Sequence, residues 1–423
     1  MAANGANGVN GVNGGTMDVP AVVGEAIKTV AGKAGFKKPR FHIESGSNDG
    51  DGYTSIIYRA IVRDEDKSGP DELRLICKTT ASDIGSGGPM MQFIYAAEDE
   101  FYGRVAPILT DIAKLQRPLP WPRCMYSKPD GARPCLVVDD KCPEGFRMAD
   151  RRVALDEHHI RHALSQLGRL HGAAMAFEVQ RPDEFNAIAE KLTVPYKRED
   201  IREMWKTFMN VSETTPDMML ERYPEGSPMH AKVKHHFSTF GEKFLNELLT
   251  PGREVGNSII HGDCHLNNML FQYDEAGACT GCCLIDFQTT RYSTTAQDLS
   301  TLLMCCTEKA MRDKHWDALL KHYHTVLQDT LRAAGIKDPD SVYSWEQFMR
   351  RLGDMAGYGL FVTPMILFAF YANQAEVKEL QGSVASVLNE SDMTSATINI
   401  KWSADMRRRV GDVIDDMVRW GWL

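Results

Sequence analysis

The residues with the clearest chemical potential lie in one short segment, His261 to Asn268, which reads HGDCHLNN. The segment follows the apolar pair Ile259-Ile260 and places Asp263 five positions before Asn268. A positioned aspartate can orient and deprotonate a hydroxyl, and carboxylate and amide oxygens are ligands that suit Mg²⁺. The segment therefore predicts proton transfer next to a divalent metal ion.

A second acidic group, Asp286, follows Asn268 by 18 positions. Strand-like stretches at Asn268 to Tyr273 and Cys283 to Phe287 flank the turn DEAGACTG, which predicts a hairpin. Because a hairpin brings its two ends together, we expect Asn268 and Asp286 to lie side by side and to ligate Mg²⁺. An ordinary turn rich in Asp and Asn is the structural alternative for HGDCHLNN.

The spacing within HGDCHLNN is that of the kinase loop H-x-D-x-x-x-x-N. In this interpretation Asp263 is the catalytic base, whereas His261 holds the loop through backbone hydrogen bonds. Gly262 stands where many protein kinases have an arginine, and only eleven residues separate Asp286 from Asp298. Both features favour a small-molecule kinase over a protein kinase.

A candidate nucleotide-binding lysine, Lys78, lies in the strand-like run LRLICKT. Alternation along a strand places Leu75 and Cys77 on one face and Ile76 and Lys78 on the other. Lys78 would then clamp the α- and β-phosphates of a nucleotide, with Ile76 as an apolar roof for the adenine ring. An edge lysine in solvent is the alternative.

A glycine-containing segment, Gly46 to Ser55, precedes the strand-like run YTSIIYRAIV. It reads GSNDGDGYTS, and the backbone N–H groups of Gly50 and Gly52 could approach phosphates. The segment does not contain G-x-G-x-x-G, and a plain turn is the alternative.

Two longer stretches carry a resemblance to a known family. HGDCHLNNMLF, followed by LIDFQTTRYSTTAQDLS, resembles the ecdysteroid-kinase-like (CHK-kinase-like) family of small-molecule kinases, relatives of choline and aminoglycoside kinases in the protein-kinase-like fold. The resemblance covers most of the chain from about Phe36. It implies ATP-dependent phosphorylation of a hydroxyl on a small molecule, with ecdysteroid hormones as the best-known substrates. By this match Asp263 is the catalytic base, and Asn268 and Asp286 are the metal ligands.

The resemblance also assigns residues outside the loop. Asp298, in QDLS, matches the aspartate that braces the catalytic loop. Glu98 matches the acidic position of an E-x-x-F-Y helix and would pair with Lys78, although Glu100 could substitute. Ser55 matches the serine of a G-x-N-Y-x-S loop and is available to a terminal phosphate, while Gly52 stands where the family usually has Asn.

The organisation of the chain predicts an α+β, bilobal, protein-kinase-like fold. Residues 1–18 repeat Asn and Gly and predict a disordered tail. Residues 19–138 are rich in strand patterns and predict a nucleotide-binding lobe with a small antiparallel sheet and a helix near 91–109, whereas 139–423 predict a mostly helical lobe with the acceptor pocket. A hinge is expected near Asp139, which would contact the nucleotide, and ligands would bind in the cleft between lobes.

Composition limits the ligand classes and the cellular locations that we expect for the protein. The net charge of -9 argues against a surface for nucleic acid or anionic membrane. Ten scattered cysteines and no signal segment predict a reducing, cytoplasmic location. The longest apolar run, Gly359 to Tyr371, is interrupted by Pro364 and is too short for a membrane span, so we expect a core segment.

The acceptor is the least defined component. Aromatic and apolar residues could line a pocket for a small apolar metabolite, either steroid-like or xenobiotic, or could simply pack helices: Trp205, Phe208, Met209, Phe361, Phe368 and Tyr371. CTGC at 279–282 could suggest zinc, but thiols in a turn are favoured because no second ligand pair is visible. His171 is expected to be a core histidine. A nucleotide-binding pseudokinase scaffold and a steroid carrier remain alternatives to the kinase.

Overall fold

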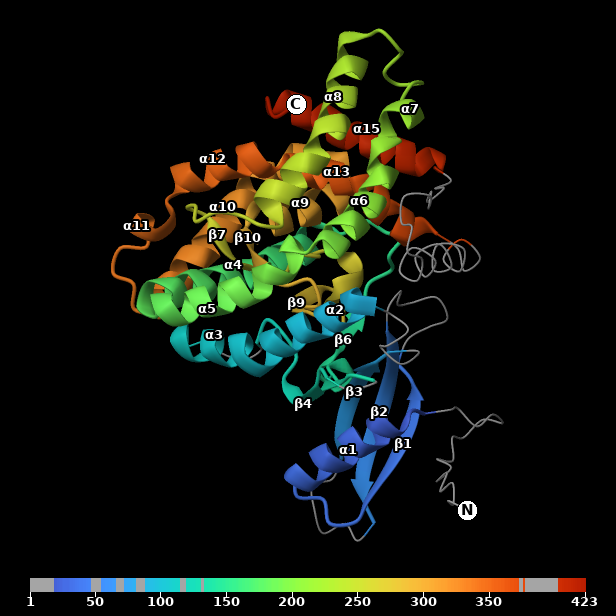
Figure 1. Cartoon of the computed structure of the whole chain (residues 1–423), viewed down its shortest axis with the longest axis vertical. Helices are drawn as coiled ribbons and strands as arrows, with labels where there is room; N and C mark the ends of the chain where they lie inside the picture. The colour runs from blue at the N-terminus through green and yellow to red at the C-terminus, as the bar shows by residue number, and fades with distance from the viewer. Residues whose placement is uncertain are drawn as a thin grey trace. The chain divides into compact units, whose positions relative to one another are not determined.

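The computed structural model describes residues 19–46, 55–65, 72–80, 88–114, 119–130, 133–372, 376 and 402–423. The chain forms two compact units, which Figure 1 colours by residue number. The first, here called the sheet unit, is Met1–Gly103 with Pro122–Pro143, and the second, the helical unit, is Arg104–Trp121 with Glu144–Leu423. The expected tail, Gly50 and Gly52 lie outside the described residues.

The sheet unit is built on an antiparallel sheet in the order β1-β2-β3-β5-β4. Its strands are β1 Pro39–Ser45, β2 Ile56–Asp64, β3 Leu73–Thr79, β4 Cys124–Lys128 and β5 Cys135–Asp139. Its helices are α1 Ala21–Lys33 and α2 Gly88–Glu100. The strand that carries Lys78, β3, is therefore internal and hydrogen-bonded on both edges.

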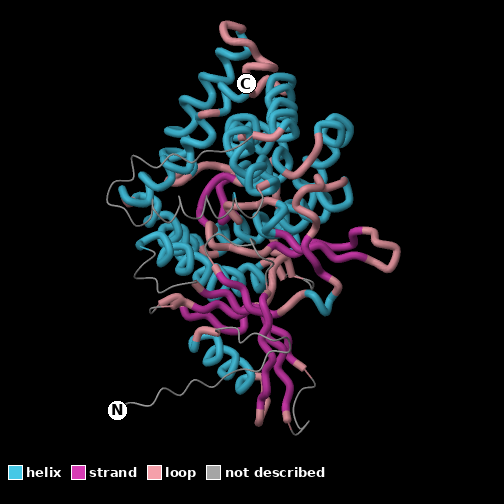
Figure 2. The backbone as a smooth tube through the Cα atoms, turned by 90° about the vertical axis from the view of Figure 1, so that its right-hand side faces the viewer, coloured by secondary structure: helices cyan, strands magenta, loops and turns pink. Residues whose placement is uncertain are grey.

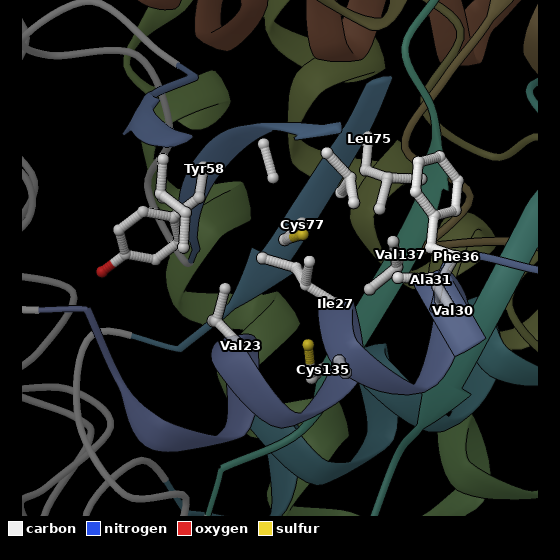
Figure 3. Packing of buried hydrophobic residues seen from close by; sticks show 14 residues of the cluster. Val23, Ile27, Val30, Ala31, Phe36, Tyr58, Leu75, Cys77, Cys135 and Val137 are labelled. Carbon is white, nitrogen blue, oxygen red and sulfur yellow. The ribbon is translucent and has the colours of Figure 1, made fainter. Parts of the chain in front are cut away.

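One face of this sheet is covered by α1, whose apolar residues recur at helical spacing. Val23, Ile27 and Val30 are buried against Cys77 of β3 and Val137 of β5, as Figure 3 shows. The burial of these side chains fixes the register of β3, because a slip by one residue would move Cys77 to the other face.

The alternation predicted for β3 is confirmed. Leu75 and Cys77 belong to the core beneath α1, while Ile76, on the opposite face, is half-buried. Lys78 shares that face by strand geometry. The core packing of one face thus presents the lysine on the other.

The helical unit consists mostly of helices, drawn in cyan in Figure 2. Its α-helices are α3 Ala106–Ile112, α4 Glu157–Gln180, α5 Pro182–Thr193, α6 Glu199–Glu213, α7 Thr215–Met218, α8 Pro228–Lys243, α9 Ala296–Cys305, α10 Lys309–Ala333, α11 Asp340–Tyr343, α12 Trp345–Met355, α13 Gly357–Tyr371 and α15 Ala404–Arg419. Its strands are β6 Phe146–Met148, β7 Asn257–Ile260, β8 Met269–Tyr273, β9 Cys279–Leu284 and β10 Arg291–Thr294.

Two small sheets position the predicted loop. β7 pairs with β10, and β8 pairs with β6 and β9, all antiparallel. Every residue of β7 and β10 is buried. The loop from His261 to Asn268 is held between the end of β7 and the start of β8, and the predicted hairpin is confirmed, with Met269 opposite Leu284.

The division into units differs from the predicted lobes in one segment. The helix expected near 91–109 is split by a π-helical turn at Phe101–Val105, and Arg104–Trp121 belongs to the helical unit. The physical reason is that α3 packs against α4. The sheet unit also extends to Pro143 rather than ending at residue 138.

The apolar run at Gly359 to Tyr371 lies in α13 and is mostly buried, as expected for a core segment. Phe361 stacks on Phe237, with ring centroids 6.0 Å apart. No single helix in the described part of the chain has the length and apolarity of a membrane span, although the bent pair Asp340–Met355 and Gly357–Tyr371 meets both criteria when its two parts are taken together.

Candidate active site

Asp298 braces the loop that carries the predicted base. It lies in the first turn of α9, where a helix favours a carboxylate. Its Oδ2 accepts from His261 N and its Oδ1 from Gly262 N, both at 2.8 Å, and the residue is 1% exposed. These bonds fix the backbone immediately before Asp263.

Gly262 is required by the shape of this turn. Its φ of 88° lies in the left-handed region that favours glycine. A Cβ at this position would collide with the carbonyl oxygen of Thr289 and the guanidinium of Arg291. The arginine found at this position in many protein kinases therefore has no room here.

His261 links the loop to the segment that carries Asp286. Its Nδ1 accepts from Asp263 N at 3.3 Å, and its Nε2 donates to the carbonyl oxygen of Ile285 at 2.9 Å. Burial lowers the pKa of His261, which favours the neutral ring that can both accept and donate. Its ring packs on Phe287, with centroids 4.5 Å apart. His261 thus makes the contacts of a residue that holds the loop.

Asp263 is held by side chains on both carboxylate oxygens. Asn268 Nδ2 donates to Oδ2 at 2.9 Å, and His265 Nε2 lies 3.1 Å from Oδ1. Burial acts to raise the pKa of Asp263, but the charge and hydrogen bond of His265 and the bond from Asn268 outweigh it and lower the pKa to about 2. Asp263 is therefore ionised at neutral pH.

The predicted metal ligands lie on adjacent segments, Asn268 just before β8 and Asp286 just after β9. Ile285 N donates to Asn268 O at 3.0 Å, so Asn268 and Asp286 leave the hairpin side by side. Asn268 Nδ2 donates to both the backbone and the side chain of Asp263, which leaves its oxygen Oδ1 as the atom suited to a metal. Asp286 has a φ of 66°, a strained value for a non-glycine residue of the kind concentrated at functional sites. The pair supplies the hard oxygen donors that Mg²⁺ takes.

In the sheet unit, Lys78 and Glu98 form a buried ion pair. Lys78 Nζ lies 2.8 Å from Glu98 Oε2, and the two residues are 8% and 3% exposed. The alternative of an edge lysine in solvent is wrong, because β3 is internal and Lys78 is buried. Glu98, from α2, makes the contact that the family match assigned to it.

The remaining nucleotide candidates are all in the sheet unit. Ser55 Oγ accepts from Tyr95 OH at 2.9 Å. Asp139 N donates to Arg123 O at 3.0 Å, and the Asp139 carboxylate binds Arg123 N and lies 3.1 Å from Lys141 Nζ. The side chain and N–H of Asp139 thus have partners within the sheet unit, and its contact with a nucleotide stays a prediction.

Two buried residues that the sequence did not assign to the site support it. His171 Nε2 lies 3.1 Å from Asp298 Oδ2, and its Nδ1 lies 2.8 Å from Tyr323 OH. Arg291 is 1% exposed, and it donates to Gly262 O at 3.4 Å and to Thr289 O at 2.9 Å. His171 was expected to be in the core, and it is, but it is also hydrogen-bonded to the aspartate that braces the loop.

Several of the residues considered for an acceptor pocket are buried in the helical unit. Met209, Phe361 and Phe368 are buried, which favours helix packing, and the side chain of Phe208 is outside the described residues. Tyr371 OH binds the Asp405 carboxylate.

Across the described ranges, no group of three or more His, Cys, Asp or Glu is arranged to hold a metal ion. The expected magnesium site, with two protein ligands, is of a different kind.

Comparison with known proteins identifies the family. A model of the ecdysteroid kinase-like family matches residues 49–336, so the chain belongs to that family. The predicted kinase-like α+β fold and the class of small-molecule kinase are therefore confirmed. A search of curated proteins found no match.

The solved structures that match the chain include a phosphotransferase and a kinase. One is a GDP complex of an aminoglycoside 2′-phosphotransferase, with 13% identity, coverage of 95% of this chain and 98% of that chain, and a TM-score of 0.38. The other is an ethanolamine kinase from Plasmodium vivax, with 11% identity, coverage of 97% and 93%, and a TM-score of 0.38.

Proposed function

We propose that the protein is an ATP- and Mg²⁺-dependent kinase that transfers the γ-phosphoryl group to a hydroxyl of a small, apolar metabolite, either an ecdysteroid-like hormone or a xenobiotic. The observation that carries the proposal is the state of Asp263. Its carboxylate is ionised and held on both oxygens, in a loop whose backbone is fixed by Asp298. A fixed carboxylate of this kind suits the orientation of an attacking hydroxyl.

For the nucleotide, we expect different roles for Lys78 and for the two predicted metal ligands. Lys78, in the sheet unit, would neutralise charge on the α- and β-phosphates while Glu98 keeps its ammonium aimed. Asn268 and Asp286, in the helical unit, would hold Mg²⁺, which neutralises phosphate charge when bound.

The ten cysteines are all free thiols, which supports a reducing, cytoplasmic setting.

On the acceptor side, the hydroxyl oxygen forms a bond to the γ-phosphorus as the bond from that phosphorus to the bridging oxygen of ADP breaks. The hydroxyl proton passes to Asp263. Because the pKa of Asp263 is about 2, the carboxylate is a weak base. Its main contribution is therefore orientation, with proton transfer late in the loose transition state typical of phosphoryl transfer.

The direct test is a product screen. The protein is incubated with Mg-ATP and a panel of hydroxylated small molecules that includes ecdysteroids and plant secondary metabolites, and phosphorylated products are detected by mass spectrometry. Asp263→Asn is the matched control, since it keeps the shape of the side chain. We expect this variant to bind nucleotide but to turn over about 10³-fold more slowly.

Two outcomes would contradict the proposal. Comparable turnover by Asp263→Asn would remove Asp263 as the base. Nucleotide binding without a phosphorylated product from any acceptor would instead support the alternative of a pseudokinase scaffold.

A further inference from the structure

His265 is a half-buried residue in contact with Asp263, and neither the motif nor the family match assigned it a role. Its side chain is 12% exposed, and its Nε2 lies 3.1 Å from Asp263 Oδ1. Its ring meets that of Phe370 edge to face, with centroids 5.8 Å apart. The other ring nitrogen, Nδ1, is buried and has no hydrogen-bond partner among the described residues.

The contact from His265 completes the restraint on the carboxylate. Asn268 Nδ2 donates to Asp263 Oδ2 at 2.9 Å, and with this contact alone the carboxylate could still pivot about the bonded oxygen. A donor at Oδ1 removes that freedom, because a carboxylate held at both oxygens has one orientation. The orientation of the Asp263 carboxylate toward the acceptor hydroxyl therefore depends on His265.

The backbone of the loop does not depend on the His265 side chain. Asp298 binds His261 N and Gly262 N, and His261 Nε2 binds the carbonyl oxygen of Ile285. Asn268 Nδ2 also donates to the backbone oxygen of Asp263 at 2.9 Å. Removal of the imidazole should thus leave the path of the loop intact and disturb the carboxylate alone.

Packing alone does not explain a histidine at position 265. A buried polar atom without a partner costs free energy, and Nδ1 of His265 is such an atom among the described residues. An apolar side chain of similar size against Phe370 would avoid that cost. The contact of His265 Nε2 with Asp263 offsets the cost of leaving Nδ1 without a partner.

We propose that His265 is a positioning residue for phosphoryl transfer, which fixes Oδ1 of Asp263 so that the carboxylate presents one orientation to the acceptor hydroxyl. This inference rests on the proposed kinase function. It assigns no proton transfer to His265, so a side chain with a neutral donor of the right length should replace it.

The test compares three variants of the full chain. His265→Leu removes the donor and keeps bulk, and His265→Gln places an amide N–H within reach of Oδ1. His265→Asn carries the same amide on a side chain one carbon shorter. The matched control is His235→Gln, because His235 is exposed on α8. The probe reactions are phosphorylation of the fastest acceptor from the product screen and phosphate release to water, which needs no acceptor.

We expect His265→Leu and His265→Asn to lower kcat about 10- to 100-fold, the range found when a group that orients a reacting ligand is lost. The KM for ATP and the Tm should stay close to those of the wild type. His265→Gln should recover most of kcat, and His235→Gln should match the wild type. If the leucine variant does not fold, the contrast between Gln and Asn still tests the donor.

Either of two results would overturn the inference while the kinase function stands: an unchanged kcat in His265→Leu, or an equal kcat in the Gln and Asn variants. If the wild-type protein transferred phosphate to no acceptor, water included, the proposed function itself would fail, and this inference would fail with it.

Discussion

In the sheet unit, Lys78 Nζ faces Glu98 Oε2 at 2.8 Å, whereas in the helical unit the Asp298 carboxylate accepts from the backbone N–H groups of His261 and Gly262. The first arrangement joins two side chains with several rotatable bonds. The second uses donors whose positions are set by the backbone, so only the Asp298 side chain has to be ordered to bind them. The comparison indicates that the loop from His261 to Asn268 is held through backbone groups, whereas Lys78 is held by another side chain.

The largest effect should come from breaking the arrangement in the helical unit. Asp298→Asn replaces one acceptor oxygen by an N–H₂ group, which must then face a backbone N–H or the ring of His171. We expect the free energy of unfolding to fall by about 3–5 kcal/mol, since a buried ionic network loses one partner. Urea unfolding followed by circular dichroism measures this change.

The matched control is Asp329→Asn on α10. Asp329 is 64% exposed and pairs with Arg332 on the surface, so its replacement should change the free energy of unfolding by less than about 0.5 kcal/mol. An equally small change in Asp298→Asn would show that other acceptors serve the loop, and the contrast between the units would be lost.

A smaller effect, on the ligand rather than on the fold, is expected from the sheet unit. Lys78→Met keeps the length of the side chain and removes its charge, and we expect kcat/KM for ATP to fall about 100-fold. Arg74→Met is the control, because Arg74 lies on the same face of β3 but is paired with Glu72 and is 39% exposed. The rise in Tm on addition of Mg-ATP gives an independent measure of binding.

The two variants together sharpen the comparison. Lys78→Met should weaken nucleotide binding strongly, whereas Asp298→Asn should act mainly on unfolding. If Arg74→Met weakened nucleotide binding as much as Lys78→Met, the effect would reflect the net charge of the sheet unit and not the position of the Lys78 ammonium group.

Features encoded locally were predictable from the sequence. The spacing of HGDCHLNN, the alternation in β3 and the turn before β9 each depend on neighbours within a few residues. Patterns of this range placed Lys78 on its face and brought Asn268 next to the segment of Asp286. Local patterns suffice here because a strand or a tight turn leaves few choices for the direction of each side chain.

Features that depend on distant packing could not be predicted. His171 meets Tyr323 across 152 positions, and the meeting requires α4 to approach α10 closely. That approach depends on Gly172, where a Cβ would lie 2.8 Å from Leu327 O. A sequence pattern identifies the apolar stripe of α4, but it does not state which helix the stripe meets.

The smallest predicted effect concerns a histidine held neutral in the helical unit. Burial lowers the pKa of His236 on α8 to about 4, and the charges of Lys243 and His235 act in the same direction. Its ring lies against that of Phe240, with centroids 5.1 Å apart.

The effect of His236 on stability has a sign that can be measured. Between pH 6.5 and about 4 the unfolded ring of His236 takes up a proton that the folded ring refuses, so acidification favours unfolding. This contribution is at most about 1.4 kcal/mol per pH unit. His236→Phe should therefore flatten the loss of stability that the wild type shows over this range. A slope equal to that of the wild type in urea unfolding from pH 6.5 to 4 would show that the α8 site does not exclude a charged ring, because a site that disfavours the proton must make the wild type lose more stability on acidification.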